Sequence, residues 1–226
     1  MPKEYKTEIL TIMFVDVAGY TRTTTFLDRD RFNTFHDVFD RLSLPIFKEY
    51  SGNVVNKIGD AFLVTFRSST DALLCATELQ KTFLEERKKD RLTPKIKIAI
   101  HAGEVMIRNN DIYGDAVNAT SRIEDAAKPG QIIFSETVFA TMNKNEIIYK
   151  HLGIRKFKGL RAPIRLFRVN SLKKGNSIST VPNIRPYCRH KRRVSNCFIF
   201  LLILSLLIIL GGVLWYLDSE LTHFIF

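Results

Sequence analysis

The order in which the hydrophobic period changes along residues 8–107 restricts the fold of this chain more than any other feature. Residues 8–17 form an apolar, β-rich run that is typical of a buried strand. Residues 27–50 and 69–88 instead place apolar side chains at helical spacing. Residues 52–66 and 94–107 return to strand-like patterns. The sequence therefore predicts the order βαββαβ.

This order is typical of an α+β fold, in which a ferredoxin-like (palm-type) antiparallel sheet carries covering helices on one face. We expect the second and third strands to meet at Ile58-Gly59-Asp60, and the strands of residues 94–107 to be broken at Gly103. Pro45 is expected to bend the first helix. The remaining expected elements are a helix over 115–127 and short strands near 131–134, 146–150, 154–158 and 164–169.

The run CFIFLLILSLLIILGGVLWYL, residues 197–217, contains no charged side chain. A helix of about 21 residues spans about 30 Å, the thickness of the hydrocarbon core of a membrane. A buried helix of a soluble core is the alternative, but such a helix is rarely apolar on every face. We expect one C-terminal transmembrane helix here, after a linker with a basic juxtamembrane cluster at 171–196 and before a short extracytoplasmic tail at 218–226.

The composition fits a globular domain with a membrane segment. Hydrophobic residues make up 46% and charged residues 25%, and the three cysteines form no disulfide or zinc pattern. Cys75 is expected in the core, and the charged N-terminus indicates no signal peptide. The net charge of +11 is compatible with nucleic acid or a membrane surface.

Several of these basic residues precede the apolar run, in the cluster Arg185, Arg189, Lys191, Arg192 and Arg193. Basic residues remain on the cytoplasmic side, so we expect the preceding domain to be cytoplasmic. A nucleic-acid-binding sheet would require exposed aromatic residues on adjacent strands, whereas TIMFV and FLVTF are typical of buried strands. We therefore expect a membrane and no nucleic acid as partner.

Three separated stretches contain the candidate chemistry. Asp16 lies at the end of a predicted strand in FVDVAGYT, before a small-residue turn that would let backbone amides approach a phosphate. Asp60 lies in the hairpin IGDAF, and two carboxylates on neighbouring strands can hold two divalent cations. Asn118 and Arg122 are four residues apart and share one helix face, where an amide and a guanidinium suit a sugar and a phosphate.

Each of these features also has a purely structural interpretation. A strand-end aspartate is usually a cap or a turn residue, and a glycine followed by Asp-Ala-Phe is a common hairpin. Asparagine and arginine one turn apart are more often a solvated helix face. The residues alone therefore indicate a palm-like domain, with metal-dependent chemistry as one option.

The stretches together resemble the class III adenylate and guanylate cyclase catalytic domain, in order and with natural spacing. The resemblance covers about residues 8–170, and the catalytic domain is expected to occupy residues 1–170. It implies a dimeric catalytic core with active sites at the subunit interface. The stretches that carry it are FVDVAGYT, GNVVNKIGDAFLVTF, IHAGEV, YGDAVNATSRIEDAAKPGQIIFS and LGIRKFKGLRAPIRLFRV.

The resemblance also implies roles for individual residues. Asp16, Val17 and Asp60 would hold two divalent metal ions, Mg²⁺ or Mn²⁺. Asn118 would orient the ribose, and Arg122 would stabilise the transition state. One chain supplies one set of these motifs, so the resemblance implies a homodimer with composite active sites.

The substrate contacts depart from the family at one position. Lys158 in FKGL resembles a lysine that contacts the triphosphate, and Asp111 falls at one base-selecting position. The other position, four residues before Asp60, is typically Lys in adenylate cyclases and Glu in guanylate cyclases, but here it is Asn56. Either a bulge lets Lys57 enter the pocket, or Asn56 reads the base itself.

The sequence therefore predicts an adenylate cyclase that makes cyclic AMP and pyrophosphate from ATP. The carboxylate of Asp111 can accept from the adenine amino group, and no glutamate at position 56 accepts from guanine. A guanylate cyclase acting on GTP is the first alternative. The second is a catalytically inactive, membrane-tethered interaction module. Such a module is expected to lack Asp16, Asp60, Asn118 or Arg122, and all four are present.

Overall fold

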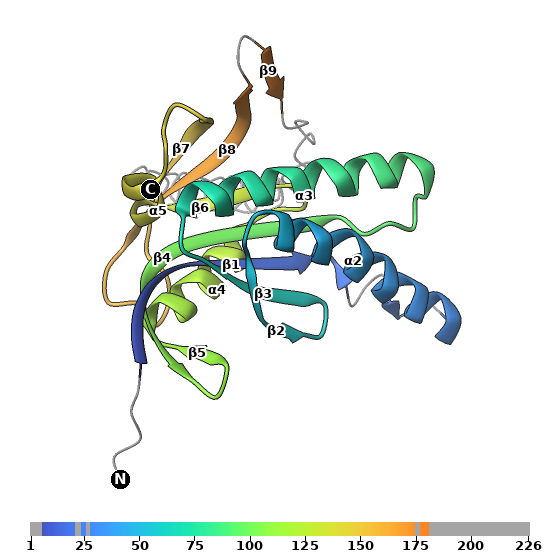
Figure 1. Ribbon diagram of the computed structural model, residues 1–226, viewed down its shortest axis with the longest axis horizontal. Helices are drawn as coiled ribbons and strands as arrows, with labels where there is room; N and C mark the ends of the chain where they lie inside the picture. The colour runs from blue at the N-terminus through green and yellow to red at the C-terminus, as the bar shows by residue number, and fades with distance from the viewer. Residues whose placement is uncertain (1–5, 21–23, 26–27, 175–176, 181–226) are drawn as a thin grey trace, which may run out of the picture. The chain divides into compact units, whose positions relative to one another are not determined.

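The computed structural model describes residues 6–20, 24–25, 28–174 and 177–180 (Figure 1). These residues belong to one compact unit, Met1–Ile184. The elements are, in chain order, β1 (Lys6–Val17), α2 (Arg29–Glu49), β2 (Asn53–Ile58), β3 (Ala61–Phe66), α3 (Ser69–Lys89), β4 (Ile96–Arg108), β5 (Asp111–Tyr113), α4 (Asp115–Ala126), β6 (Ile132–Ser135), α5 (Glu136–Thr141), β7 (Ile147–Arg155), β8 (Ile164–Lys174) and β9 (Ser177–Thr180).

The strands form one nine-stranded sheet in the order β2-β3-β1-β4-β6-β8-β7, with β5 paired to β4 and β9 paired to β8. All the pairs are antiparallel except β4 and β6, which are parallel. Strand β1 lies between β3 and β4 and pairs with β4 from Lys6 to Val17. The α+β fold with a mainly antiparallel sheet and the predicted order βαββαβ are therefore confirmed.

The alternation along β1 sends its side chains to two separate cores. Met13, Val15 and Val17 pack with residues of α2, α3 and α5 on one side of the sheet, which we call the α2/α3 face. Leu10 and Ile12 pack with Ala116 of α4 on the other side, which we call the α4 face. In Figure 1, α2 and α3 accordingly run in front of the sheet while α4 lies behind it.

The expectation that helices cover one face of the sheet is therefore wrong for α4. This helix has small or branched residues at Ala116, Ala119 and Ile123, and all three side chains are buried. These positions are three and four residues apart, so they form one stripe that packs directly on the strands. Residues 115–127 were expected to be helical, and α4 confirms this prediction, but no sequence pattern assigned the helix to a face.

The expected break at Gly103 is absent, because β4 runs continuously through this residue. Gly103 is paired with Leu10 of β1 and faces Ala116 of α4. A Cβ atom at position 103 would lie 2.8 Å from the Cβ of Ala116, closer than two carbon atoms normally approach. The glycine therefore allows α4 to lie close to β4 and does not end the strand.

Two further strands are longer than expected. One strand, β7, replaces the two short strands expected near 146–150 and 154–158, and register shifts follow Ile148 and His151. Strand β8 extends to Lys174 and pairs with β9, in a segment expected to belong to the linker. Backbone pairing tolerates the polar residues that indicated a loop here, so residues 171–174 and 177–180 are strands.

Two further expectations for the described residues are met. The hairpin of β2 and β3 turns at Gly59 and Asp60, and Cys75 is buried in the core. Helix α2 continues through Pro45. The basic cluster and the expected transmembrane segment lie outside the described residues. Among the residues that are described, no helix is long and apolar enough to cross a membrane.

Replacing Gly103 with alanine should destabilise the domain by about 1–3 kcal/mol, because the added methyl group must displace α4. Thermal or urea unfolding measures this change. The matched variant is Ala116→Gly, which removes the methyl group that the new one would meet. The double variant should be more stable than the sum of the two single effects predicts, and strict additivity would contradict direct packing of these positions.

Candidate active site

Asp16 and Asp60 lie side by side at one end of the sheet. Asp16 is in β1 directly opposite Ala61 of β3, the residue that follows Asp60. The backbone N–H of Val17 donates to the carbonyl oxygen of Asp60 at 3.3 Å, which ties the hairpin turn to the end of β1. Partial burial, and next the charge of Asp16, raise the pKa of the Asp60 carboxyl. The two carboxyl groups therefore repel each other when both are ionised.

Local backbone geometry fixes both aspartates. Gly59 has φ of +61°, a left-handed conformation that glycine adopts without strain, so it permits the tight turn that presents Asp60. After Asp16, the N–H of Ala18 donates to the carbonyl oxygen of Lys95 at 2.8 Å. The amides of Val17 and Ala18 are thus engaged within the fold. The expectation that the turn at Ala18-Gly19 offers its amides to a phosphate is therefore not met at Ala18.

Tyr20 connects the same stretch to α2. Its hydroxyl lies 3.0 Å from Nε2 of His36, and its ring packs at 6.4 Å from Phe32 and 6.0 Å from Phe35 between ring centroids. Burial, followed by the charge of Asp60, raises the pKa of the Tyr20 hydroxyl. This anchor holds the chain beyond Asp16 against the α2/α3 face.

Sequence reasoning missed two charged residues next to Asp16. Lys97 of β4 is paired directly with Asp16 across the sheet, and its Nζ lies 3.0 Å from Oδ2 of Asp16. The same Nζ lies 2.5 Å from Oε1 of Glu124 on α4. The exposed fractions of these side chains are 20% for Lys97, 18% for Asp16 and 14% for Glu124. One ammonium group therefore serves two carboxylates in a largely buried cluster.

The pKa shifts in this cluster have a common cause. Burial lowers the pKa of Lys97, but its contacts with Glu124 and Asp16 outweigh burial and leave that pKa above its ordinary value. For Glu124, burial is the largest cause and Asp16 adds to it, so its pKa rises to about 7 although Lys97 opposes the shift. One positive charge cannot fully compensate two negative charges at low solvent exposure.

One signal for this cluster was available in the sequence. Lys97 occurs in PKIKIAI, where the alternation of a buried strand turns the residue toward the α4 face. A charged residue in such a strand needs a partner of opposite sign. The partner is Glu124, which is far away in the sequence, so the pattern alone did not identify it.

Asn118, Arg122 and Lys158 are brought together in a separate cavity. Asn118 and Arg122 lie on successive turns of α4, and Lys158 comes from the loop between β7 and β8. Arg122 also lies 3.2 Å from Asp125, but both side chains are more than half exposed, so this surface ion pair is weak and leaves Arg122 available to a ligand. The cavity has a volume of about 300 Å³ and is lined by Asn118, Ser121, Arg122, Lys158, Gly159 and Leu160.

This cavity and the aspartate pair lie on different sides of α4. Glu124, which reaches toward Asp16 through Lys97, and Arg122 are two residues apart, about 200° around an α-helix. Neither Asp16 nor Asp60 lines the cavity of Asn118 and Arg122. Within a single chain, these two groups of predicted residues are therefore not brought together.

The positions expected to read the base lie on opposite faces of β2. A register shift between Val54 and Asn56 pairs Asn56 with Leu63, whose side chain packs on the α4 face. Lys57 pairs with Phe62, which belongs to the α2/α3 face. The bulge therefore puts Asn56, and not Lys57, on the same face as α4.

Two contacts hold Lys57 on the α2/α3 face. Its Nζ lies 2.5 Å from Oδ1 of Asp40 on α2 and 5.5 Å from the centroid of the Phe62 ring. Asp111 lies at the start of β5, and its own carboxylate accepts a hydrogen bond from the N–H of Ile112 at 2.8 Å. Of the three predicted base contacts, only Asn56 lies on the α4 face, because Ile112 packs there and the alternation along β5 turns its neighbour Asp111 to the other face.

A Ser–His pair is also present, although no such pair was evident from the sequence. Nδ1 of His101 lies 2.8 Å from the hydroxyl oxygen of Ser135, and Thr137 lies close to both. Burial lowers the pKa of His101. Since Ser135 is fully buried at the end of β6, the pair stabilises the strands and is closed to a substrate.

The donor set at Asp16 and Asp60 fits magnesium or manganese. Two carboxylates and the main-chain carbonyl of Val17 are hard oxygen donors, and the Val17 side chain is buried in the core. Within the described ranges, no three His, Cys, Asp or Glu side chains are arranged to hold an ion. Further oxygen ligands must therefore come from phosphate groups and water, as Mg²⁺ commonly requires.

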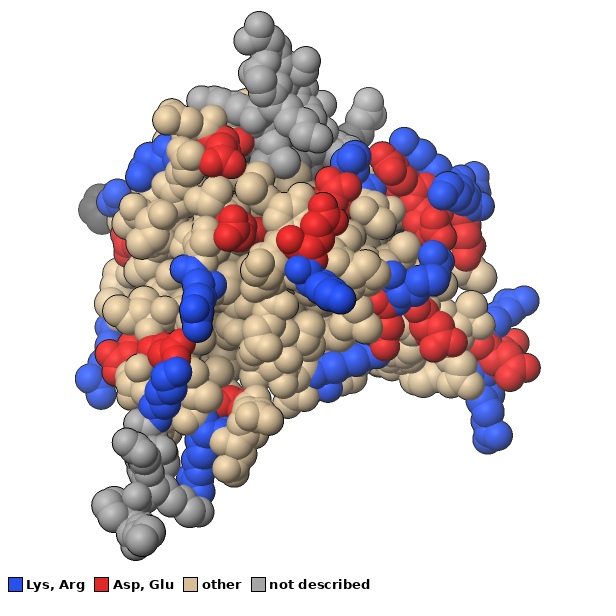
Figure 2. Space-filling view, in the orientation of Figure 1, with Lys and Arg blue, Asp and Glu red and all other residues tan. Residues whose placement is uncertain are grey.

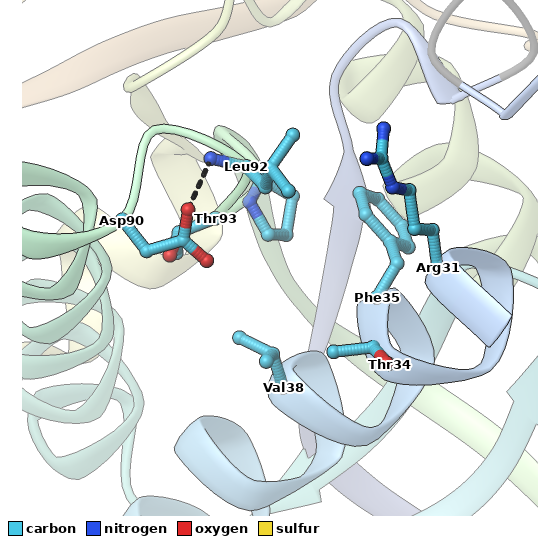
Figure 3. Close-up of a pocket in the computed structure, with 8 residues that line it drawn as sticks. Arg31, Thr34, Phe35, Val38, Asp90, Leu92 and Thr93 are labelled. Carbon is cyan, nitrogen blue, oxygen red and sulfur yellow. Dashed lines mark hydrogen bonds between the residues drawn. The ribbon is translucent and has the colours of Figure 1, made fainter. Parts of the chain in front are cut away.

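An apolar cavity of about 80 Å³ lies away from all these residues (Figure 3). Arg31, Thr34, Phe35 and Val38 of α2 face the loop that leads from α3 to β4 across it. The loop is held by the carboxylate of Asp90, which accepts a hydrogen bond from the N–H of Leu92 at 2.8 Å. This cavity shares no residue with the aspartate pair or with the cavity of Arg122.

The chain belongs to the family of adenylate and guanylate cyclase catalytic domains, whose pattern matches residues 3–171. It is 29% identical over 174 residues to a protein named serine/threonine-protein kinase pkn2 from Myxococcus xanthus, with 75% of this chain and 21% of that protein covered. It is 26% identical over 175 residues to putative adenylate cyclase 3 from Rhizobium meliloti, with 74% and 29% covered. The chain thus spans less than a third of these relatives.

Among solved structures, the chain is similar to an adenylate/guanylate cyclase/hydrolase from Silicibacter pomeroyi. The identity is 28%, the TM-score is 0.64, and 73% of this chain and 97% of that chain are covered. The described domain is therefore a class III nucleotidyl cyclase catalytic domain. Domains of this family bind nucleotides, work as dimers and generally use divalent metal ions.

Proposed function

We propose that this chain is a homodimeric adenylate cyclase that converts ATP to 3′,5′-cyclic AMP and pyrophosphate. The observation that carries the proposal is the division of the site. Asp16 and Asp60 form one half, and Asn118, Arg122 and Lys158 surround a cavity on a different side of α4. A twofold axis would bring the first half of one chain to the second half of its partner.

Each residue has a role in this composite site. Divalent metal ions at Asp16 and Asp60 would lower the pKa of the ribose 3′-hydroxyl and neutralise phosphate charge. Asn118 would hold the ribose, so that the 3′-oxygen lies in line with the α-phosphorus. Arg122 would stabilise the charge that develops in the transition state, and Lys158 would bind the departing phosphates.

The reaction exchanges one bond to phosphorus for another. The 3′-oxygen forms a bond to the α-phosphorus, the bond from that phosphorus to the bridging oxygen breaks, and pyrophosphate leaves. The hydroxyl proton passes to bulk water. No covalent enzyme intermediate is required, so the closed position of Ser135 beside His101 is consistent with the proposal.

Two residues at the expected base-selecting positions support ATP as the substrate. Asp111 can accept a hydrogen bond from the amino group of adenine, and Asn56 provides an amide that both donates and accepts. Lys57 is paired with Asp40 and lies on the other face of β2. A guanylate cyclase is the alternative, since the family includes both activities and the Asn56 amide can also pair with guanine.

Nucleic-acid binding has little support in the charge distribution of the described residues. Figure 2 shows the face covered by α2 and α3, where Lys and Arg side chains are interspersed with Asp and Glu. A basic footprint would require one sign of charge over a continuous surface. Basic and acidic side chains are equal in number on each of these two helices, and some of them form ion pairs, such as Arg41–Glu86 and Lys81–Glu78.

The composite site predicts complementation between two inactive variants. Asp16→Ala removes a metal ligand and Arg122→Ala removes the transition-state contact, so each homodimer should be inactive. In an equimolar mixture, half of the dimers are mixed and each has one intact site, so about a quarter of wild-type activity should return. Cyclic AMP formation against protein concentration measures the recovery.

The matched control mixes Asp16→Ala with Asp60→Ala. Both lesions then fall in the same half, so every site keeps a damaged aspartate pair and no activity should return. If the first mixture stays inactive while mixed dimers are shown to form, the composite site is wrong.

We also propose that the chain is a single-pass membrane protein with a cytoplasmic catalytic domain. Support comes from the uncharged run at 197–217 and from the basic cluster at 185–193 that precedes it. Reporter fusions at Met1 and Phe226 should report opposite sides of the membrane. Two reporters on the same side would contradict a single span.

A further inference from the structure

The ion pair between Lys97 and Asp16 occupies a carboxylate that the proposed function needs for metal. Nζ of Lys97 lies 3.0 Å from Oδ2 of Asp16, and the register of β1 and β4 places the two residues directly opposite each other. The side chains of Lys97 and Asp16 are about one-fifth exposed, so water screens the interaction only in part. Lys97 and a divalent ion therefore attract the same oxygen atom.

Glu124 gives Lys97 a second place to bind. Its Oε1 lies 2.5 Å from Nζ of Lys97, and it comes from α4, an element that the aspartate pair does not share. A lysine that left Asp16 would remain paired at Glu124 and would not become an isolated charge. Such an isolated charge would be costly in a partly buried position.

We propose that Lys97 is a built-in counter-cation that holds Asp16 before the metal binds, and that it then releases Asp16 and stays paired with Glu124 when the metal binds. Lys97 and Glu124 are positioning residues in this account, because both act on the metal through Asp16. The inference rests on the proposed function only in requiring that Asp16 binds a divalent ion. Lys97 also balances the two adjacent carboxylates, Asp16 and Asp60, when no metal is present.

This exchange predicts effects of opposite sign for the two partners. Lys97→Met removes the competing cation and leaves Glu124 close to Asp16, so metal should bind about tenfold more tightly. Glu124→Gln removes the carboxylate that receives the lysine, so Lys97 stays on Asp16 and metal should bind about tenfold more weakly. An ion pair with only a structural role would lower stability in both variants without opposite changes in metal affinity.

The experiment measures Mn²⁺ binding to the full-length protein by electron paramagnetic resonance. Binding is measured without nucleotide and again with 3′-deoxy-ATP, which lacks the attacking hydroxyl group. Thermal unfolding with and without Mn²⁺ is recorded in parallel. Lys95→Met is the matched control, because it removes an exposed lysine two residues from Lys97 for which no salt bridge to Asp16 is found. Lys97→Arg keeps the positive charge and should retain affinity near that of the wild type.

Opposite shifts for Lys97→Met and Glu124→Gln, with Lys95→Met and Lys97→Arg near the wild type, would support the exchange. Shifts of the same sign, or no shift, would overturn it. If Lys97→Met does not fold, Glu124→Gln still tests the proposal, because unchanged affinity in that variant is incompatible with it.

Asp16→Asn separates this inference from the proposed function. If Mn²⁺ binding is lost in Asp16→Asn but is unchanged by substitutions at positions 97 and 124, the metal site is supported and the exchange is wrong. If the wild type binds no Mn²⁺ that depends on Asp16, even with 3′-deoxy-ATP, the metal assignment fails and the exchange fails with it.

Discussion

The antiparallel pairing of β1 between β3 and β4 is the constraint on which the rest of the site depends. Pairing with β3 sets Asp16 beside the turn that carries Asp60. Pairing with β4 sets Asp16 opposite Lys97, and β4 in turn supports α4 at Gly103. A shift of one residue in either pairing would turn Asp16 to the other face of the sheet. The chemistry of the site is therefore fixed by backbone hydrogen bonds in the centre of the sheet.

The same sheet separates two kinds of interaction. The α2/α3 face contains most of the aromatic and aliphatic core, and stability comes mainly from that side. The α4 face contains a smaller apolar cluster together with Asp16, Lys97 and Glu124. These three polar side chains are one-fifth exposed or less, and the core on the opposite face packs against the strands β1 and β4 that carry Asp16 and Lys97. Helix α4 links the two halves of the site, because Glu124 and Arg122 project from different sides of it.

Local patterns predicted the elements well, because period and turn residues act within short stretches. The apolar spacing of α3, the hairpin at Gly59 and the shared helix face of Asn118 and Arg122 are examples. Features that depend on contacts between distant residues were missed or misread. Gly103 was interpreted as a break, since its contact with Ala116 of α4 is visible only in three dimensions.

The charged cluster at Asp16 and the bulge in β2 could not be predicted for the same reason. The partners Lys97 and Glu124 are distant in the sequence, so neither predicted the other. The sequence left two possibilities for β2, and only the register against β3 separates Asn56 from Lys57 by face. The ion pair of Lys57 with Asp40 depends on where α2 lies, which no local pattern specifies. Where a site is assembled from several elements, sequence patterns supplied the candidates but not their partners.

In the proposed function, this domain cyclises ATP with the carboxylates of Asp16 and Asp60. The most direct measurement incubates the purified full-length protein with ATP or GTP in Mg²⁺ and in Mn²⁺, and separates the products by chromatography. We expect cyclic AMP and pyrophosphate in equal amounts, a higher kcat/KM for ATP than for GTP, and loss of product in a folded Asp60→Ala variant. Absence of any cyclic nucleotide, or equal activity in that variant, would contradict the proposed function.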